Sequence, residues 1–406
     1  MAEPVAGAAA APERPRSEPY LIVFTLWLLV FSSASQTMII SPILPMIGDQ
    51  LSIADAALGT LVSAYSVMVA VFAIISGPIS DKIGRRRILI LGCVTMTLAL
   101  TLHGLVTSYA AFLAVRVFAG CAGGVLSGAA VSYIGDYFPY DRRGWATGWV
   151  MSGAAFGQII GIPLGIVLAA RWGFRSPFYI FAATMAVTVV LLFVKMPQPK
   201  VKRTTHPLSV SKAAADYVAM LRRREVAWAA LAFFMMFLGV SIFVIYLPTW
   251  LKRDLGATGD QIALMFLVGG IANVVTGPLA GKLSDRIGRK GIILMAAVGL
   301  SIVMVLTVPL VTNLLAAYVF FFLTMMLVAM RVSPFSALLT ALVTDERRGS
   351  LMSLTVALGQ MGFALGGAVA GLLFADVGYF SNTVLGAAFV LIMGLIVWFR
   401  IPEPGV

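Results

Sequence analysis

Long apolar segments separated by short polar connections run through almost the whole chain. Within each segment apolar residues occupy all sides of a helix, whereas a surface helix of a soluble protein carries them on one side. An α-helix needs roughly 20 such residues to cross about 30 Å of hydrocarbon. Segments that meet this condition lie near residues 20–47, 57–80, 88–107, 109–135, 145–170 and 174–196, and again near 226–251, 259–282, 291–312, 314–343, 350–374 and 379–399. The pattern predicts an all-α membrane protein with twelve transmembrane helices.

Composition and charge support this interpretation. The chain is 60% hydrophobic and 11% charged, with a mean hydropathy of +0.98, whereas soluble domains are about 25% charged. The net charge of +12 comes from short basic runs between the apolar segments, such as Arg85–Arg87 and Arg222–Arg224. Such runs mark cytoplasmic loops, so the excess of basic residues requires no nucleic-acid partner. We expect a multi-pass protein of the plasma (inner) membrane, surrounded by lipid, with both termini cytoplasmic.

The same pattern divides the chain into two bundles of six helices. Residues 1–19 have no apolar core and are expected to form a disordered cytoplasmic tail. Residues 20–196 form the first bundle and residues 226–400 the second, with a short cytoplasmic tail over 401–406. The basic segment 197–225 is a cytoplasmic linker. Around 210–221 it is compatible with either a short interfacial helix or a disordered tether.

An internal repeat relates the two halves. The loop after the second helix reads Gly-Pro-Ile-Ser-Asp-Lys-Ile-Gly-Arg-Arg-Arg from Gly77, and Gly-Lys-Leu-Ser-Asp-Arg-Ile-Gly-Arg-Lys-Gly from Gly281. Asp81 and Asp285 are 285 − 81 = 204 positions apart. A second pair of loops, Asp-Arg-Arg-Gly ending at Gly144 and Glu-Arg-Arg-Gly ending at Gly349, repeats at 349 − 144 = 205. Two matches at nearly one offset predict duplicated, pseudo-symmetric halves.

The repeated loops combine glycine, which lets helices approach closely, with charges that can pair across the inner surface. We expect this charge lattice to join the halves in an outward-facing state and to break when the inner side opens. The alternative is that the loops only set the membrane topology. The predicted conformational-switch residues are Gly77, Asp81, Lys82, Gly84, Arg85, Arg86, Gly281, Asp285, Arg286, Gly288 and Arg289.

The loop pattern G-x-x-x-D-[RK]-x-G-[RK]-[RK] resembles the signature loop of the major facilitator superfamily and occurs in both halves. The fourth segment, with Arg116 followed by a glycine-rich run, resembles that family's fourth helix. The fifth is similar to the motif of its antiporter branch, carried here by Gly157, Gly161, Pro163 and Gly165. The resemblance implies the major facilitator fold and favours the 12-helix drug:proton antiporter and sugar-efflux branch. Spacing alone equally fits ordinary glycine-mediated helix packing.

Two charged residues fall inside predicted spans, Arg116 in the fourth and Arg331 in the tenth. A charge in hydrocarbon is costly, so each is a candidate functional residue, although either can instead brace the bundle by bonding backbone carbonyls. The resemblance implies that the first, fourth, seventh and tenth helices line a central cavity. Neutral polar candidates for substrate binding, each of which can also serve only to bond helices together, are Gln36, Gln158, Tyr246, Asn273, Ser333 and Gln360. A cavity of this kind favours an anionic amphiphile.

Proton coupling has no obvious carrier. In the antiporters that the chain resembles, an acidic residue often stands about nine positions before the Leu-Pro of the first helix, and Gln36 stands here. Acidic residues fall near the ends of the predicted spans. A coupled proton would therefore be carried by Asp49, Asp81 or Asp136, or by the substrate itself.

Motifs of enzymes and ATP-driven pumps are absent from the sequence, which has no G-x-x-x-x-G-K-[ST] and no H-E-x-x-H. We expect no enzyme activity, no cofactor, no metal site and a monomeric protein. The resemblance favours a secondary active transporter, an efflux antiporter for a small amphiphilic solute that works by rocking one half against the other. The alternatives are a coupled or facilitative importer of an organic anion or other metabolite and, more remotely, a membrane receptor or scaffold that transports nothing.

Overall fold

The computed structural model describes residues 19–199, 217–342 and 348–403, and this part of the chain consists of helices joined by short connections, without strands. Within these described residues, twelve helical spans are long and apolar enough to cross a membrane. The predicted all-α fold with twelve spans is thereby confirmed. The predicted N-terminal tail and most of the linker lie outside the described residues, and of the proposed linker helix residues 217–221 are helical.

The described residues of the first half form ten helical elements. They are α1 (Pro19–Met38), α2 (Ile40–Leu51), α3 (Asp55–Ile83), α4 (Arg85–His103), α5 (Tyr109–Leu126), α6 (Ala129–Tyr137), α7 (Tyr140–Phe156), the π-helix η1 (Gly157–Gly161), α8 (Ile162–Trp172) and α9 (Ser176–Lys195). The second half contains α11 (Arg224–Val244), α12 (Leu247–Asp254), α13 (Gly259–Ile287), α14 (Arg289–Leu310), α15 (Leu314–Ala341), α16 (Arg348–Asp376) and α17 (Tyr379–Arg400).

Several spans predicted as single helices are interrupted. The first divides between α1 and α2 because Pro42 cannot donate a backbone hydrogen bond to Met38. The fourth divides between α5 and α6 at Gly128, whose φ of +75° favours glycine. The seventh divides before Pro248, which leaves the Val244 carbonyl without its helical donor. Hydropathy averaged along a segment does not detect a local break in a helix, so the sequence pattern predicted none of these three interruptions.

The repeat appears in the backbone as well. Gly84 separates α3 from α4 with a φ of +102°, and Gly288 separates α13 from α14 with a φ of +98°. A β-carbon is disfavoured in this backbone region, so both loops require glycine. At the opposite end, Ser108 caps α5 and Asn313 caps α15 by accepting the backbone N–H three residues later.

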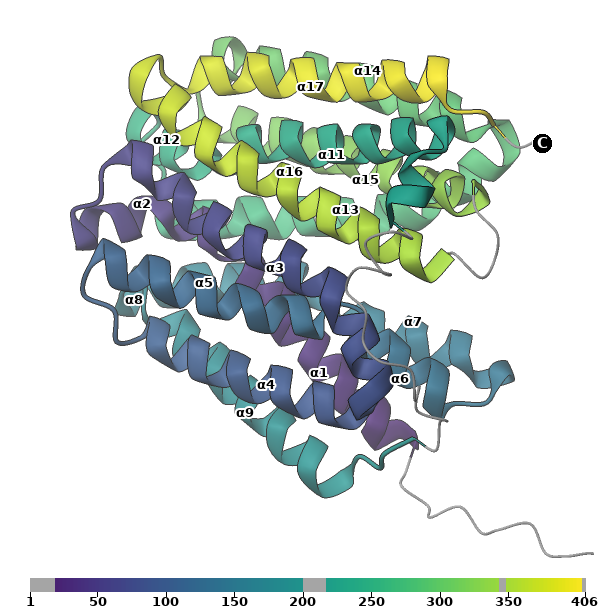
Figure 1. Cartoon of the computed structure of the whole chain (residues 1–406). Coiled ribbons are helices and arrows are strands. Elements are labelled where there is room, and N and C mark those ends of the chain that lie inside the picture. The colour runs from purple at the N-terminus through teal and green to yellow at the C-terminus, as the bar shows by residue number, and fades with distance from the viewer. Residues whose placement is uncertain (1–18, 200–216, 343–347, 404–406) are drawn as a thin grey trace, which may run out of the picture.

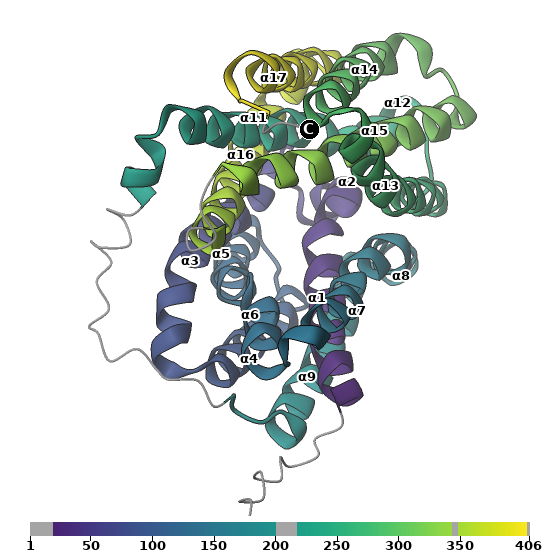
Figure 2. The ribbon, with the colours of Figure 1, turned by 90° about the vertical axis from the view of Figure 1, so that its right-hand side faces the viewer.

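The two halves form separate bundles that meet along their sides (Figure 1). α3 packs on α16, α8 and η1 pack on α13, and α2 packs on α12. The ribbons of the halves diverge toward the end where α6 finishes and α7 starts, as the view from that end also shows (Figure 2). We call this the loop end, defined by Gly84 and Gly288. The opposite end, where α2 meets α12, is called the latch end.

Candidate functional site

Buried polar side chains of α1, α3 and α5 meet inside the first half. Gln36 donates from Nε2 to the Tyr65 hydroxyl and to Thr37 Oγ1, each at 2.9 Å. The Arg116 guanidinium lies 4.2 Å from the centroid of the Tyr65 ring and donates from Nε to the Leu61 carbonyl at 3.0 Å. Tyr65 therefore connects two of the predicted binding residues, Gln36 and Arg116, into one cluster.

This cluster retains unused hydrogen-bonding groups. Gln36 is 0% exposed and Arg116 is 1% exposed, yet Gln36 Oε1 and Arg116 Nη1 have no hydrogen-bond partner. A buried polar atom without a partner costs about 1–3 kcal/mol, and more when the group is charged. One acceptor and one cationic donor are thus available to a polar ligand. The hydrogen bond from Arg116 to the Leu61 carbonyl braces the bundle, but it uses only one nitrogen of the guanidinium group and leaves Nη1 without a partner.

Arg331 is the corresponding feature of the second half. It lies well inside α15, is 1% exposed, and neither its Nε nor its Nη1 has a hydrogen-bond partner. Leaving one member of a buried ion pair alone typically costs about 3–5 kcal/mol. Among the described residues, Arg116 and Arg331 are the charged side chains that stand more than six positions from either end of a helix. The bundle interior is therefore positively charged in both halves.

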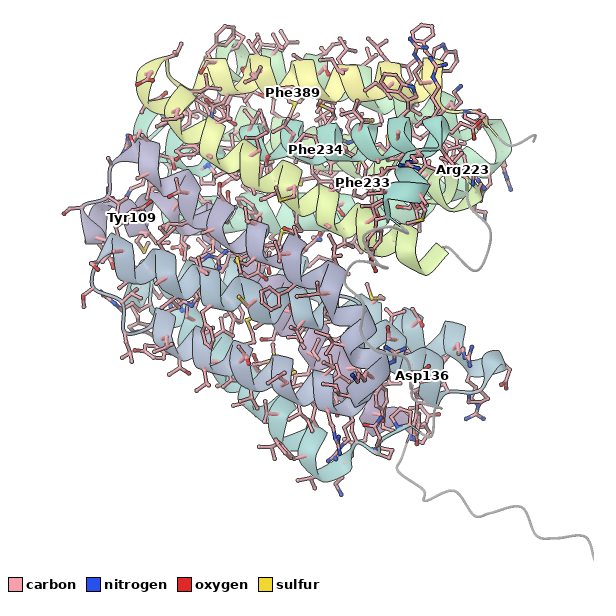
Figure 3. The ribbon with its side chains drawn as sticks, viewed as in Figure 1. Tyr109, Asp136, Arg223, Phe233, Phe234 and Phe389 are labelled. Atoms are coloured by element: carbon pink, nitrogen blue, oxygen red, sulfur yellow. The ribbon has the colours of Figure 1, made fainter. Side chains whose placement is uncertain are left out.

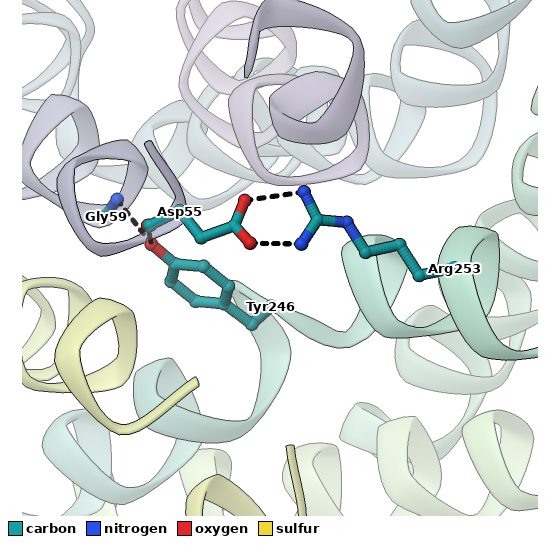
Figure 4. Close-up of polar contacts among 4 residues, drawn as sticks. All are labelled: Asp55, Gly59, Tyr246 and Arg253. Carbon is teal, nitrogen blue, oxygen red and sulfur yellow. Dashed lines mark hydrogen bonds and ion pairs between the residues drawn. The ribbon is translucent and has the colours of Figure 1, made fainter. Parts of the chain in front are cut away.

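At the latch end, polar contacts join the halves (Figure 4). Tyr246, fully buried, donates its hydroxyl proton to the Asp55 carbonyl at 2.5 Å and accepts from the Gly59 backbone N–H at 2.8 Å. Both Arg253 terminal nitrogens pair with the Asp55 carboxylate, Nη2 at 2.7 Å. These residues come from α3 in one half and from α12 with the preceding turn in the other. We call Asp55, Gly59, Tyr246 and Arg253 the latch.

Backbone contacts extend the latch along the same interface. Ser41 donates to the carbonyls of Val244 and Ile245 at 3.1 Å, using the acceptor that Pro248 leaves free. Farther along, Ser63 of α3 donates to the Ala364 carbonyl of α16 at 2.5 Å. Lys252 pairs with Asp49 at 2.5 Å, but both side chains are largely exposed, so this pair contributes little.

Glycine allows the halves to approach at this interface. A β-carbon on Gly59 would lie 1.9 Å from the Gly367 carbonyl oxygen, and one on Gly371 would lie 2.6 Å from the Ala56 carbonyl oxygen. Neither could be accommodated without moving α3 from α16. The latch end is therefore closed by direct backbone packing as well as by polar contacts.

At the loop end, the predicted switch residues contact their own half. Arg85 pairs with Asp136 of α6 at 2.6 Å, in the region labelled in Figure 3. Arg86 donates to the Phe193 carbonyl at 2.8 Å, and Asp285 pairs with Arg289 one turn later at 3.2 Å. Lys82 and Arg286 are exposed, and the side chain of Asp81 and the surroundings of Gly77 lie outside what the structure describes. These ion pairs and hydrogen bonds within each half are consistent with a state in which the two halves are separated at the loop end. That the loops join the halves in another state stays a prediction.

The remaining predicted binding residues do not join either arginine. Tyr246 belongs to the latch. Gln158 packs its backbone against Gly270 of α13, which brings η1 next to the other half. Asn273 and Gln360 are half-buried and Ser333 is exposed, with its hydroxyl against Gly281. Their predicted role in binding is untested by these contacts.

The predicted antiporter helix is a close-packing surface against α1. β-carbons added to Gly157 and Gly161 would lie 3.0 Å and 2.0 Å from the Ser35 hydroxyl oxygen, and one on Gly165 would lie 2.8 Å from an Ile39 side-chain carbon. The π-helical turn ends two residues before Pro163, whose missing N–H loosens the helical ladder. Close packing is the observed role, and an additional role in antiport stays a prediction.

The three candidate proton carriers all lie near the ends of helices. Asp49 pairs with Lys252, Asp136 pairs with Arg85, and the side chain of Asp81 is outside the described ones. Each acidic residue in the described part of the chain lies within two positions of a helix end, apart from Glu403, which follows α17.

Sequence reasoning missed three residues that organise these sites. Tyr65 was overlooked because a lone tyrosine in an apolar segment has no distinctive pattern. Asp55 and Arg253 were missed because they belong to no motif and their pairing joins positions 198 residues apart. The offset of the repeat offered no help, because the latch joins the halves asymmetrically.

Comparison with known proteins identifies the family. The family model described as Major Facilitator Superfamily matches residues 26–253 and 229–406. Multidrug resistance protein MdtG of Proteus mirabilis (strain HI4320) is 27% identical over 94% of this chain and 96% of its own length. The uncharacterized MFS-type transporter YceJ of Bacillus subtilis (strain 168) is 26% identical over 94% and 97%.

Solved structures share the fold. A crystal structure of a D-xylose–proton symporter superposes with a TM-score of 0.79 at 19% identity, covering 95% of this chain and 98% of that one. A bacterial homolog of the human lysosomal transporter Spinster, in an inward-facing and occupied conformation, gives a TM-score of 0.76 at 16% identity, covering 96% and 97%. The members of this family are transporters and not enzymes, and the chain belongs to the major facilitator superfamily.

Proposed function

We propose that this transporter exports a small amphiphilic anion by alternating access, with Arg116 and Arg331 as the residues that bind its charge. The observation that supports the proposal is that both guanidinium groups are buried and incompletely bonded, one in each half. Guanidinium binds carboxylate and phosphate oxygens through strong, charge-assisted hydrogen bonds. The adjacent Gln36 amide oxygen and Tyr65 ring add a polar contact and an aromatic surface.

The proposal includes an assignment of the loop end and the latch end to the two sides of the membrane. The basic runs Arg85–Arg87, Arg142–Arg143 and Arg286–Lys290 are at the loop end, whereas the latch end has the fewer basic residues Arg171, Arg175, Lys252 and Arg253. The positive-inside rule then assigns the loop end to the cytoplasm and the latch end to the outer face. A closed latch with diverging ribbons at the loop end corresponds to an inward-facing state, ready to accept solute from the cytoplasm.

Export follows if the loaded protein closes its loop end and opens its latch. The halves move as bodies, so Asp55, Tyr246 and Arg253 exchange their contacts across the halves for water. Efflux is favoured over import by the relatives named multidrug resistance proteins. We further propose that the protein is a monomer, since both buried arginines belong to one chain.

Flux into proteoliposomes tests the proposal. Three radiolabelled probes differ in charge: p-aminohippurate as an anion, its uncharged amide, and tetraphenylphosphonium as a cation. We expect saturable transport of the anion only, reduced at least about tenfold by Arg331→Gln and less by Arg331→Lys, which keeps the charge. The matched control Arg171→Gln removes an equal charge from an exposed site outside the repeated loops and the latch, and leaves flux unchanged. Transport of the cation, or wild-type flux in Arg331→Gln, contradicts the proposal.

A further inference from the structure

We propose that the second half binds an anionic phospholipid on its lipid-facing side at the loop end. Five residues form the site, and we call them the cationic row: Arg224, Trp228, Lys290, Trp398 and Arg400. They come from the starts of α11 and α14 and from the end of α17. This site is separate from the buried arginines of the two halves and does not depend on what the protein transports.

Cations and tryptophans alternate along the row. Lys290 Nζ lies 5.7 Å from the centroid of the Trp398 ring, and Arg400 Cζ lies 5.3 Å from the centroid of the Trp228 ring. Helical side chains lean toward the N-terminus, so Trp228 covers the turn that begins at Arg224. Because α17 packs against both α11 and α14, the row crosses three neighbouring helices. The guanidinium groups of Arg224 and Arg400 therefore lie near the same aromatic ring.

The positive charges of the row are not neutralised by carboxylates. Among the described residues, Arg224, Lys290 and Arg400 form no ion pair. Glu225 is exposed and also unpaired in this part of the chain, and Glu403 accepts hydrogen bonds from backbone N–H groups at the start of α14 instead. Arg224 and Arg400 are exposed, so both can reach an external anion. Guanidinium binds phosphate oxygens through strong, charge-assisted hydrogen bonds.

The row lies at the depth and on the side where a lipid headgroup is found. α14 and α17 are on the side of the second half farthest from the first half, as both views show (Figures 1 and 2). Tryptophan and basic residues favour the boundary between hydrocarbon and water. Toward the membrane centre, α11 and α17 continue with exposed Leu231, Leu391 and Leu395. A phosphate over the cations and acyl chains over these leucines together fit an anionic phospholipid.

The first half indicates that the fold itself does not require the row. Lys290 corresponds to Arg86, since 290 − 86 = 204, and Arg86 donates to backbone carbonyls at the end of α9. Arg400 corresponds to Lys195, since 400 − 195 = 205, and Lys195 lies over no aromatic ring in the part of the chain that the structure describes. α1 begins with Pro-Tyr-Leu, without a cation. A general need for positive charge at this end would apply to both halves, so the row of the second half supports a bound anion.

Native mass spectrometry of the full-length protein tests the site. The probes are dioleoyl-phosphatidylglycerol and dioleoyl-phosphatidylcholine, which share their acyl chains and differ in net charge. We expect preferential retention of phosphatidylglycerol, with an affinity at least about tenfold lower in the double variant Arg224→Gln/Arg400→Gln. The matched control is Arg87→Gln/Lys195→Gln, which removes two exposed cations from the same end of the first half and should bind phosphatidylglycerol like wild type.

Three outcomes overturn the site. Equal retention of the two lipids would show that the headgroup charge is not recognised. An equal loss of affinity in both double variants would assign the binding to surface charge in general. Displacement of the lipid by glycerol 3-phosphate, which has the phosphate without the acyl chains, would identify a soluble phosphate as the ligand.

Tryptophan fluorescence in bilayers gives a second readout. In phosphatidylcholine vesicles, a minor fraction of brominated phosphatidylglycerol should quench wild-type fluorescence more than an equal fraction of brominated phosphatidylcholine. Trp228→Phe/Trp398→Phe should remove most of this difference, because the row holds the anionic lipid beside these rings. Trp149→Phe/Trp172→Phe, which replaces two exposed tryptophans elsewhere, should keep it. An undiminished difference in Trp228→Phe/Trp398→Phe contradicts the proposal.

Discussion

Replacing Tyr246 by Phe removes a single oxygen atom from the latch. The ring keeps its contact with Phe374, 5.0 Å between centroids, but the hydrogen bonds to the Asp55 carbonyl and from the Gly59 N–H are lost. A neutral hydrogen bond contributes about 0.5–1.5 kcal/mol net, so two contribute about 1–3 kcal/mol. Because both join the halves, this free energy stabilises the closed latch end. Its loss should shift the equilibrium toward the state with the latch open by about 5- to 150-fold.

Double electron–electron resonance measures that shift. Spin labels at Leu105 and Leu315 report on opposite halves, since both residues are highly exposed next to the latch end, after Cys93 and Cys121 have been replaced by alanine. We expect wild type to show mainly the shorter distance and Tyr246→Phe to populate a longer one. Tyr179→Phe is the matched control, because it removes a hydroxyl that bonds the Gly104 carbonyl at 2.8 Å within one half.

The reasoning is refuted if Tyr246→Phe has the wild-type distance distribution, or if Tyr179→Phe shifts it equally. The first result would mean that backbone packing of α3 on α16 closes this end without the latch. The second would mean that the loss of any buried hydroxyl loosens the bundle.

Three further predictions concern packing and the polar cluster. Gly161→Ala should lower the thermal unfolding temperature, since overpacking typically costs about 1–3 kcal/mol and the new methyl would overlap a hydroxyl of α1; Gly148→Ala, with no atom within 4 Å of the added carbon, is the control and should unfold like wild type. Gly84→Ala should slow transport and destabilise the loop, because alanine at a φ of +102° is strained by about 1 kcal/mol or more; a wild-type melting curve and flux would disprove this. Tyr65→Phe should weaken anion binding severalfold by freeing the Gln36 amide while leaving the fold intact, and titration calorimetry showing unchanged affinity would count against a role for the cluster.

The fold was predictable because its determinants are local in the sequence. Apolar length specifies a span, and glycine with charge at one offset specifies the repeat, as Gly84 and Gly288 show with nearly the same backbone conformation. Interruptions such as that before Pro248 depend on one residue and average out in a hydropathy window. The presence of each helix was therefore predicted correctly, whereas the interruptions within helices were not.

The candidate site was predictable only in part. Arg116 and Arg331 were identifiable because a charge inside a span is costly wherever it points. Tyr246 stays a predicted binding residue, whereas its hydrogen bond with the backbone of α3 joins positions 187 residues apart and no local pattern reveals it. Pairing between Gln36 and Tyr65 likewise depends on the angle at which α1 crosses α3, which is set by side-chain packing across the whole half.

In the proposed mechanism, the buried arginines Arg116 and Arg331 bind the charge of the transported solute. Equilibrium binding of radiolabelled p-aminohippurate to the purified protein, measured beside its uncharged amide, tests this most directly. We predict one saturable site for the anion, with an affinity at least about tenfold lower in Arg331→Gln and in Arg116→Gln, and no saturable binding of the amide. Equal binding of the anion and the amide, or wild-type affinity in both variants, would contradict it.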